Sequence, residues 1–451
     1  MMTIALTLQI IFFALVMVAF LSSRSASLFH PMAFYLMFHG IVFVLRPLVV
    51  HYLGLYGIFR YLTIEPDENL MVQTLLVSSF GLLVFSIPAL LLGQGRIRFP
   101  EMAFEFTNAQ RQAFVAVLLL LGPLAIYSAT VAGGEVSFSG GDGVQMSYDM
   151  LTGNAIYVNS TGYIVDAQSM GGALGILIIW RYRFAWWSFI PLGMFLALRA
   201  FMGWGRWAIV LTLMSLALLY LFKTGRRWPR VHYAIFVVPL FLLFQSLGAD
   251  RNYIRDSIAQ DDTPKFTYRA AATQTSSLDT PDFANFDFLA YVLRAVPDLS
   301  QTYTYFTQYL QLFTEPIPRI LWSGKPVGPP IQLINLNDYG NFRGMTVSLI
   351  GDGWMSLGWV GIVVTLGFAA SVLALVHRWF WRNNDRPKVV LIYCLFVPLS
   401  IQWFRDGGIS IAKFVLFTML PLLLWDWMTS LIEGLGRRLA TSGERPRPRR
   451  S

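Results

Sequence analysis

The sequence has 451 residues and a net charge of +9, but only 13% of its residues are charged, 55% are hydrophobic, and the mean hydropathy is +0.55. Soluble proteins carry about a quarter charged residues, so this composition excludes an ordinary soluble protein of this length. The basic residues are scattered over short connections, which argues against a nucleic-acid-binding patch. Cys394 is the only cysteine, so the chain forms no internal disulfide and no cysteine-based zinc site.

Apolar runs recur along the whole chain. A helix needs about 20 apolar residues to cross a hydrocarbon core of about 30 Å. The sequence predicts eleven such spans, at residues 4–21, 31–54, 70–93, 112–132, 161–180, 184–202, 206–222, 231–248, 350–376, 388–404 and 408–431. The expected fold is therefore an all-α polytopic membrane protein.

The distribution of Lys and Arg predicts the orientation of these spans. Alternate connections are basic, and twenty of the 34 Lys and Arg residues fall on one side if there are eleven spans. The positive-inside rule makes that side cytoplasmic, with the amino terminus outside and the carboxyl terminus inside. A cleaved signal peptide is the alternative for the first span, but no basic residue precedes Arg24.

The chain divides into four parts. Residues 1–248 carry eight spans and a short external loop at 133–160, residues 249–349 form a long periplasmic loop, residues 350–432 carry three spans, and residues 433–451 form a basic tail at the membrane surface. A structureless loop of about a hundred residues is unusual, so the long loop should contain secondary structure and have a function.

Apolar residues within the long loop recur at helical spacing, namely Leu299, Tyr303, Phe306, Leu310 and Phe313. The pattern predicts one amphipathic helix that lies against the bundle or the interface. A functional alternative makes it the lid of a cavity. Tyr303, Tyr305 and Tyr309 would then be available to stack on sugar rings.

Cations on the external side have two readings. Arg199 and Arg206 flank the tight connection between the sixth and seventh spans. They either snorkel to lipid headgroups or form an anion clamp, because arginine forks match phosphate oxygens. Arg251 and Arg255, at a spacing of four beyond the eighth span, are weaker candidates, and Arg46 inside the second span is ambiguous.

A proline-rich segment from Glu315 to Pro326 precedes the ninth span. Its prolines make it rigid, so it can present Arg319 and Lys325 at a fixed height, or it simply returns the chain to the bundle. Asp352, which follows it, is either an ion-pair partner or a general base.

Two further charged positions lie at the expected external edge of the membrane. Arg405 pairs locally with Asp406 or completes a basic ring. Asp166 in the fifth span pairs with an arginine or binds an acceptor hydroxyl. The sequence contains no Walker-A loop, HExxH, GxSxG or CxxC motif, and its external loops contain no Asp-x-Asp pair, which argues against a divalent-metal mechanism.

Four elements together resemble the O-antigen polymerase (Wzy-type) or oligosaccharide-repeat-unit polymerase family. They are Gly205-Arg206 opening a span, the element Pro318-Arg319-Ile320-Leu321-Trp322-Ser323-Gly324-Lys325-Pro326, the stretch Gly351-Asp352-Gly353, and the turn Arg405-Asp406-Gly407. The resemblance implies a metal-independent and cofactor-free glycosyltransferase of the GT-C type in the bacterial inner membrane. Such an enzyme transfers a growing glycan from undecaprenyl pyrophosphate onto a lipid-linked repeat unit at the periplasmic face.

The resemblance also implies roles for individual residues. Arg199, Arg206, Arg319 and Arg405, supported by Lys325, would hold the pyrophosphate, with Arg251, Arg255, Asp166 and Tyr303 as weaker contacts to substrate. Asp352 would be the general base, with Glu315 as the second choice. The resemblance implies a chain-length regulator and a flippase as protein partners. The surrounding membrane lipid is a further partner.

Three alternatives stay open. An O-antigen ligase or another GT-C lipid-sugar transferase has a similar layout, but related ligases favour a histidine in the external loop, and none occurs between His232 and His377. A flippase of lipid-linked oligosaccharide would explain the spans, although transporters are typically built from internal repeats. A structural membrane partner without activity is the third.

Overall fold

The computed structural model describes most of the chain. The described residues are 1–100, 106–132, 146–148, 155–157, 164, 166–201, 206–230, 232, 279, 283–317, 321–322, 324–326, 328–342 and 345–443, and of these the side chains of 131–132, 146–148, 155–157, 206–208, 410 and 437–443 are left undescribed. The expected eighth span at 231–248 therefore lies outside the described residues, apart from His232.

The described chain is a bundle of helices with one antiparallel hairpin, in which Ser147 pairs with Ile156. The helices and strands are α1 (Met2–Leu21), α2 (Pro31–His39), the π-helix η1 (Gly40–Leu45), α3 (Arg46–Leu53), α4 (Gly57–Tyr61), α5 (Glu68–Leu92), α6 (Asn108–Ala132), β1 (Met146–Tyr148), β2 (Ala155–Tyr157), α8 (Ser169–Arg181), η2 (Trp186–Ser188), α9 (Phe189–Phe201), α10 (Arg206–Lys223), α14 (Asn285–Arg294), η4 (Ala295–Leu299), η5 (Thr307–Leu310), α15 (Gln311–Thr314), η6 (Leu336–Asp338), α16 (Ser348–Asn383), α17 (Pro387–Phe396), η7 (Val397–Leu399), α18 (Ser400–Asp406) and α19 (Ser410–Gly443).

Seven helices in the described ranges are long and apolar enough to cross a membrane, which makes the chain a multi-pass membrane protein. They are Met2–Leu21, Pro31–Leu53, Glu68–Leu92, Asn108–Thr130, Ser348–Asn383, Pro387–Asp406 and Ile411–Gly436. The expectation of eleven full spans is therefore not met by the described chain. The expected spans at 161–180, 184–202 and 206–222 correspond to shorter apolar helices, Ser169–Arg181, Trp186–Phe201 and Ile209–Lys223.

The shortness of α8 has a physical explanation in its packing. A Cβ on Gly171 would lie 2.1 Å from the Phe195 ring, and one on Gly175 would lie 2.7 Å from Leu192, so α8 packs closely against α9. Almost every residue of α8 is buried as a result. A helix enclosed by protein does not face lipid, so its length need not match the thickness of the bilayer.

Helix α16 is broken near its beginning. Leu357 and Gly358 have non-helical backbone angles, with φ +57° at Gly358, and separate a first segment (residues 348–356) from a long segment (residues 359–383). The two segments touch, since a Cβ on Gly353 would lie 2.9 Å from the Cα of Ile362. The expected ninth span is thus a short helix that turns back into a long one, and the short helix carries Asp352.

The expected amphipathic helix over residues 299–313 is wrong. Gln301, Tyr305 and Phe306 have positive φ angles, and only η5 and the single turn α15 are helical. The backbone N–H groups of Thr304 and Tyr305 instead donate to the carbonyls of Met355 and Ser356, at 2.8 and 3.0 Å. These carbonyls end a helix and need donors, so pairing between distant segments overrides the local periodicity.

The two ends of the bundle differ in character. The connections that carry Arg24, Arg96, Arg98, Arg227 and Arg382 come together at one end, the basic end, where the Leu28 N–H donates to the Arg227 carbonyl at 3.0 Å and the Asn384 amide donates to the Arg98 carbonyl at 2.7 Å. The opposite end, the loop end, carries η5, α15 and the turn between α18 and α19. These connections, which the sequence predicts to share one side, thus contact one another.

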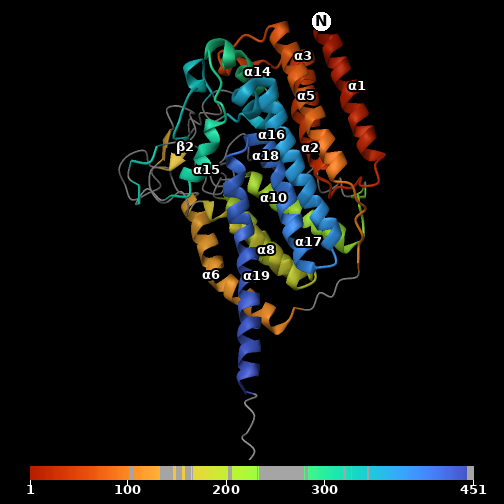
Figure 1. Ribbon diagram of the computed structural model, residues 1–451, viewed down its shortest axis with the longest axis vertical. Helices are drawn as coiled ribbons and strands as arrows, with labels where there is room; N and C mark the ends of the chain where they lie inside the picture. The colour runs from red at the N-terminus through yellow and green to blue at the C-terminus, as the bar shows by residue number, and fades with distance from the viewer. Residues whose placement is uncertain are drawn as a thin grey trace, which may run out of the picture.

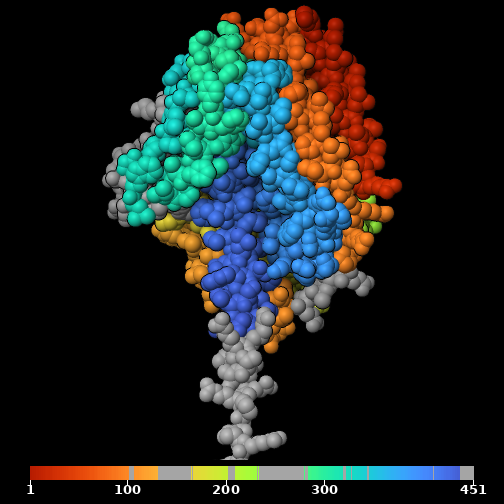
Figure 2. Space-filling view, in the orientation of Figure 1, coloured from red at the N-terminus to blue at the C-terminus, as the bar shows by residue number. Residues whose placement is uncertain are grey.

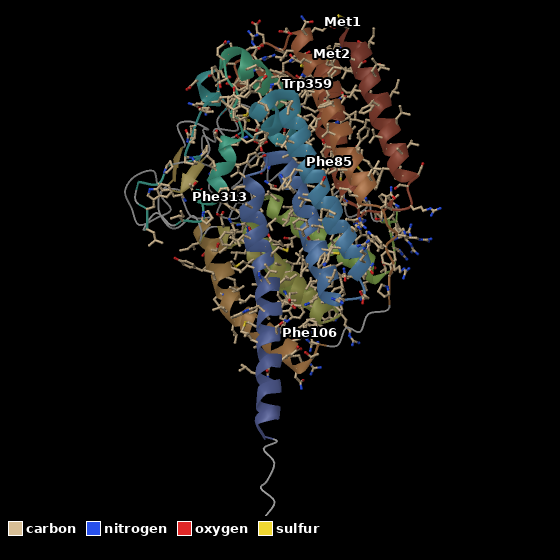
Figure 3. The ribbon with its side chains drawn as sticks, viewed as in Figure 1. Met1, Met2, Phe85, Phe106, Phe313 and Trp359 are labelled. Carbon is tan, nitrogen blue, oxygen red and sulfur yellow. The ribbon has the colours of Figure 1, made fainter. Side chains whose placement is uncertain are left out.

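The figures show the arrangement of these elements. In Figure 1, α14 and α15 lie at the upper left of the bundle, α1 forms its right edge, and α19 extends below the other helices. Residues near 300 form a continuous cover over the upper left in Figure 2. Trp359, labelled at the upper part of α16 in Figure 3, packs edge-on against Phe80 of α5 with ring centroids 5.1 Å apart.

Candidate functional site

Asp352 is a buried hub at the loop end. Its Oδ1 accepts from the Gln308 side chain at 2.8 Å, and its Oδ2 accepts from the Tyr309 hydroxyl at 2.6 Å and from the Gly408 N–H at 3.0 Å. Ser356, one turn later, accepts from the same Gln308 amide at 2.7 Å. The carboxylate therefore joins η5, the first segment of α16 and the turn before α19. A carboxylate offers about four lone-pair positions, so three donors leave room for one more contact.

Tyr309 lies between Asp352 and the rest of the loop. Burial raises the pKa of the Tyr309 hydroxyl well above its usual range, and the neighbouring Asp352 carboxylate raises it further. The hydroxyl thus keeps its proton at physiological pH. Gly408 allows this close approach, because a Cβ there would lie 2.5 Å from the Tyr309 ring. Tyr309 can pass a proton to Asp352 while it accepts another, but it cannot act as a base by itself.

Glu315 is enclosed by two lysines. Its Oε1 lies 2.5 Å from Lys413 Nζ and its Oε2 lies 3.9 Å from Lys325 Nζ. Lys325 also donates to the carbonyls of Glu315 and Ile317, at 2.8 and 3.1 Å. Burial alone would raise the pKa of Glu315, but the two ammonium groups outweigh it and hold the pKa below its ordinary value. A carboxylate of this kind is a weak base, so Asp352 is the better of the two candidates.

Arg405 is buried at the end of α18. Its Nη1 lies 3.4 Å from Asp406 Oδ1, and the Gln402 amide donates to the other oxygen of Asp406. The side chain of Asn285 on α14 donates to the Arg405 carbonyl and to Thr346 Oγ1, each at 3.1 Å. Sequence reasoning anticipated the pair with Asp406. It did not anticipate that α14 holds the backbone of the turn.

The remaining predicted cations are only partly described. Arg199 is 2% exposed near the end of α9, so it does not snorkel to lipid headgroups as one of its readings proposed. The backbone of Arg206 begins α10, but its side chain lies outside the description. Arg319, Arg251 and Arg255 also lie outside the described residues. The full arginine clamp predicted from the sequence therefore stays a prediction.

Asp166 and Tyr303, the weaker candidates, both lie near this end. Burial raises the pKa of Asp166 to about 6, an effect that Lys413 opposes and Glu315 adds to, so Asp166 lies within electrostatic reach of both. Tyr303 lies at the break in α16, where a Cβ on Gly358 would be 3.2 Å from its hydroxyl. The structure thus brings Asp166 to the lysine–glutamate cluster and places Tyr303 beside the first segment of α16.

A buried ion triad fixes α14 in the bundle. Arg46 Nε lies 2.8 Å from Asp287 Oδ2, its Nη2 lies 2.7 Å from Asp279 Oδ1, and the Gly57 N–H donates to the other oxygen of Asp279 at 2.8 Å. All three ionised side chains are buried. Burial raises the pKa of Asp287, while Arg46 acts in the opposite direction. Asp287 and Asn285 lie on the same helix, so the triad positions the contact to Arg405.

Sequence reasoning missed both carboxylates of this triad. A charged residue inside a membrane span is expected to have a partner within the protein. Arg46 lies in the expected second span, so the sequence did indicate that it has such a partner. The partners are 233 and 241 residues away along the chain, and no local pattern identifies them.

The groove between α1 and α5 is apolar. It has a volume of about 440 Å³ and is lined by Met1, Ile4, Ala5, Leu8, Gln9, Phe12, Val72, Leu75, Leu76 and Ser79, none with an ionisable side chain. No group of three or more His, Cys, Asp or Glu residues suited to a metal ion occurs within the described ranges.

Comparisons with known proteins give no match among family models, curated proteins or solved structures.

Proposed function

We propose that this protein is a membrane glycosyltransferase that polymerises lipid-linked oligosaccharide repeat units, of the O-antigen-polymerase type, with its active site at the loop end. The observation that carries the proposal is the buried Asp352–Tyr309 pair beside Arg405 and the Lys325–Glu315–Lys413 cluster. A candidate base and several cations thus meet at the end opposite the basic connections. That end would face the periplasm by the positive-inside rule.

The chemistry is a substitution at the anomeric carbon of a lipid-linked sugar. An acceptor hydroxyl attacks this carbon and forms the new glycosidic C–O bond, while the C–O bond to pyrophosphate breaks and its electron pair moves to the pyrophosphate oxygen. The hydroxyl proton passes to Tyr309, whose own proton passes to Asp352. This relay suits Tyr309, because the 2.6 Å contact already aligns its proton with the carboxylate.

The cations would stabilise the departing pyrophosphate. Preorganised positive groups lower the barrier where negative charge develops, without a metal. Arg199, Arg405 and Lys325 are the described residues of this proposed group, and Arg206 and Arg319 are its further proposed members. Phosphate oxygens would replace the Glu315 carboxylate between Lys325 and Lys413, so Glu315 keeps the two lysines in place when substrate is absent.

The test is the glycan profile made by the purified protein from a lipid-linked repeat unit. Asp352→Asn and Tyr309→Phe should each reduce polymerisation by about 10²–10⁴-fold, the range for losing general-base catalysis. Asp298→Asn removes a carboxylate from an exposed position of the long loop and should leave activity unchanged. Normal polymer from well-folded Asp352→Asn would refute the assigned base.

Deleting the gene separates the proposed function from its alternatives. A strain without a polymerase should carry single repeat units on the lipid carrier. A strain without a ligase should accumulate long chains on the carrier, and a strain without a flippase should show neither form outside the cell. Either of the last two profiles would overturn the proposal.

A further inference from the structure

The basic end is built on a cluster of four phenylalanines from separate parts of the chain. Phe29 precedes α2, Phe99 follows α5, Phe222 ends α10, and Phe380 lies near the end of α16. Their ring centroids are 5.4–6.1 Å apart for the pairs Phe29–Phe99, Phe29–Phe222, Phe29–Phe380, Phe99–Phe222 and Phe222–Phe380. Aromatic pairs at such distances are favourable, so this cluster fixes the connections that carry the arginines.

Backbone contacts hold the arginine-bearing connections on this cluster. The Leu28 N–H donates to the Arg227 carbonyl at 3.0 Å, which joins residues 22–30 to residues 224–230. The Asn384 amide donates to the Arg98 carbonyl at 2.7 Å. Gly95 lies flat against Trp381, where a Cβ would be 2.3 Å from the indole ring. These contacts therefore fix the backbone positions of Arg96, Arg98 and Arg227.

These arginines lack an ion-pair partner among the residues that the structure describes, since no described carboxylate lies at ion-pair distance from Arg96, Arg98 or Arg227. Arg96 and Arg98 are exposed and Arg227 is half-buried. Partial burial lowers the pKa of Arg227, and the nearby positive charge of Arg96 lowers it further. Two like charges held close together cost free energy unless an anion binds between them.

Exposed apolar side chains lie at the same end of the bundle as these arginines, as expected near the headgroups of a membrane. α1 and α5 end here, and Leu21 and Leu91 in their last turns are exposed, Leu91 by 64%. Trp228 is also exposed and packs edge-on against Phe20 with ring centroids 6.4 Å apart. Tryptophan is enriched at the membrane–water interface, and exposed leucines at the same level offer a surface for acyl chains.

We propose that Arg96, Arg98 and Arg227 form a binding site for the phosphate of an anionic phospholipid in the adjacent leaflet. Arginine forks match phosphate oxygens in geometry and charge, and basic pockets between membrane helices bind anionic headgroups. The acyl chains would lie along the exposed leucines of α1 and α5. A lipid, rather than free phosphate, is the ligand because the arginines and the apolar surface are contiguous. This inference is independent of the proposed enzymatic function.

The test is lipid binding to the purified full-length protein in a neutral detergent, measured by native mass spectrometry. Phosphatidylglycerol or cardiolipin should bind, and phosphatidylcholine should bind at least about tenfold more weakly, since the net charge of the headgroup carries the interaction. Arg96→Gln combined with Arg227→Gln should weaken anionic-lipid binding by about tenfold or more. Arg111→Gln removes an exposed arginine at the start of α6 and should leave binding unchanged.

Three outcomes would overturn this site. Equal binding of phosphatidylcholine would show that the headgroup charge is irrelevant, and an equal loss in Arg111→Gln would show only general attraction to the basic end. Displacement of the lipid by inorganic phosphate at a similar concentration would identify a free-phosphate site. Gel filtration and the thermal unfolding midpoint of each variant separate lost binding from lost folding.

Discussion

One set of cations at each end of the bundle shows how the same residue types are used in opposite ways. At the loop end and in the buried ion triad, Arg46, Lys325, Arg405 and Lys413 each lie within 4 Å of a carboxylate. At the basic end, Arg96, Arg98 and Arg227 have no such partner in the described chain. A buried charge must be paired to be tolerated, whereas an exposed charge is available to ligands from outside. The first arrangement fixes structure, and the second attracts anions.

The largest expected effect is in the buried triad. Asp287→Asn removes a charge that faces Arg46 at 2.8 Å and should destabilise the protein by about 3–5 kcal/mol, because it leaves a buried charge poorly compensated. Thermal unfolding in detergent measures the change. The control is Asp338→Asn, at an exposed aspartate that accepts a hydrogen bond from the Asn335 side chain. If the two variants were equally stable, the triad would not be what holds α14 in the bundle.

A smaller effect is expected at the Asp352 hub. Tyr309→Phe removes one of three donors to a buried carboxylate and should destabilise the fold by about 1–2 kcal/mol, in addition to its effect on activity. Asp352 keeps Gln308 and the Gly408 N–H, so the protein should still fold. Unchanged stability would mean that solvent replaces the hydroxyl, and that the hub is more open than its burial indicates.

The Glu315 cluster should contribute less. Its side chain is 27% exposed and that of Lys413 is 42% exposed, so Glu315→Gln should cost less than about 1 kcal/mol after solvent screening. Because the pKa of Glu315 is held below its ordinary value, its contribution is present above the usual glutamate range and is lost as the pH falls through the lowered pKa. A stability difference that grows in acid would contradict the ion pair.

The smallest effect on stability is expected at the basic end. Arg98→Gln removes an exposed side chain without a described partner and should change stability by no more than about 0.5 kcal/mol. The same variant should nevertheless weaken anionic-lipid binding. A loss of several kcal/mol would show that Arg98 is structurally paired, and the contrast between the two ends would disappear.

Much of the fold could be predicted from local sequence. Most of the expected spans correspond to described helices within a few residues, because apolar length and Lys/Arg placement are properties of short segments. Helix starts were also locally encoded: Asp67 caps α5 by accepting from the Leu70 N–H at 2.6 Å. The helix predicted from Leu299 to Phe313 failed because its backbone donors serve carbonyls of α16 instead.

The candidate site was predicted only in part. Asp352 and Arg405 were identified from short motifs, but the partners that define their chemistry, Tyr309 and Asn285, were not, because these contacts join segments 43 and 120 residues apart. The sequence alone determined that the chain has apolar helices long enough to cross a membrane and which connections are basic, since these depend on composition over short stretches. Only the tertiary structure decided which charges are buried in pairs and which stay exposed, because pairing depends on distances between side chains that lie far apart in the chain.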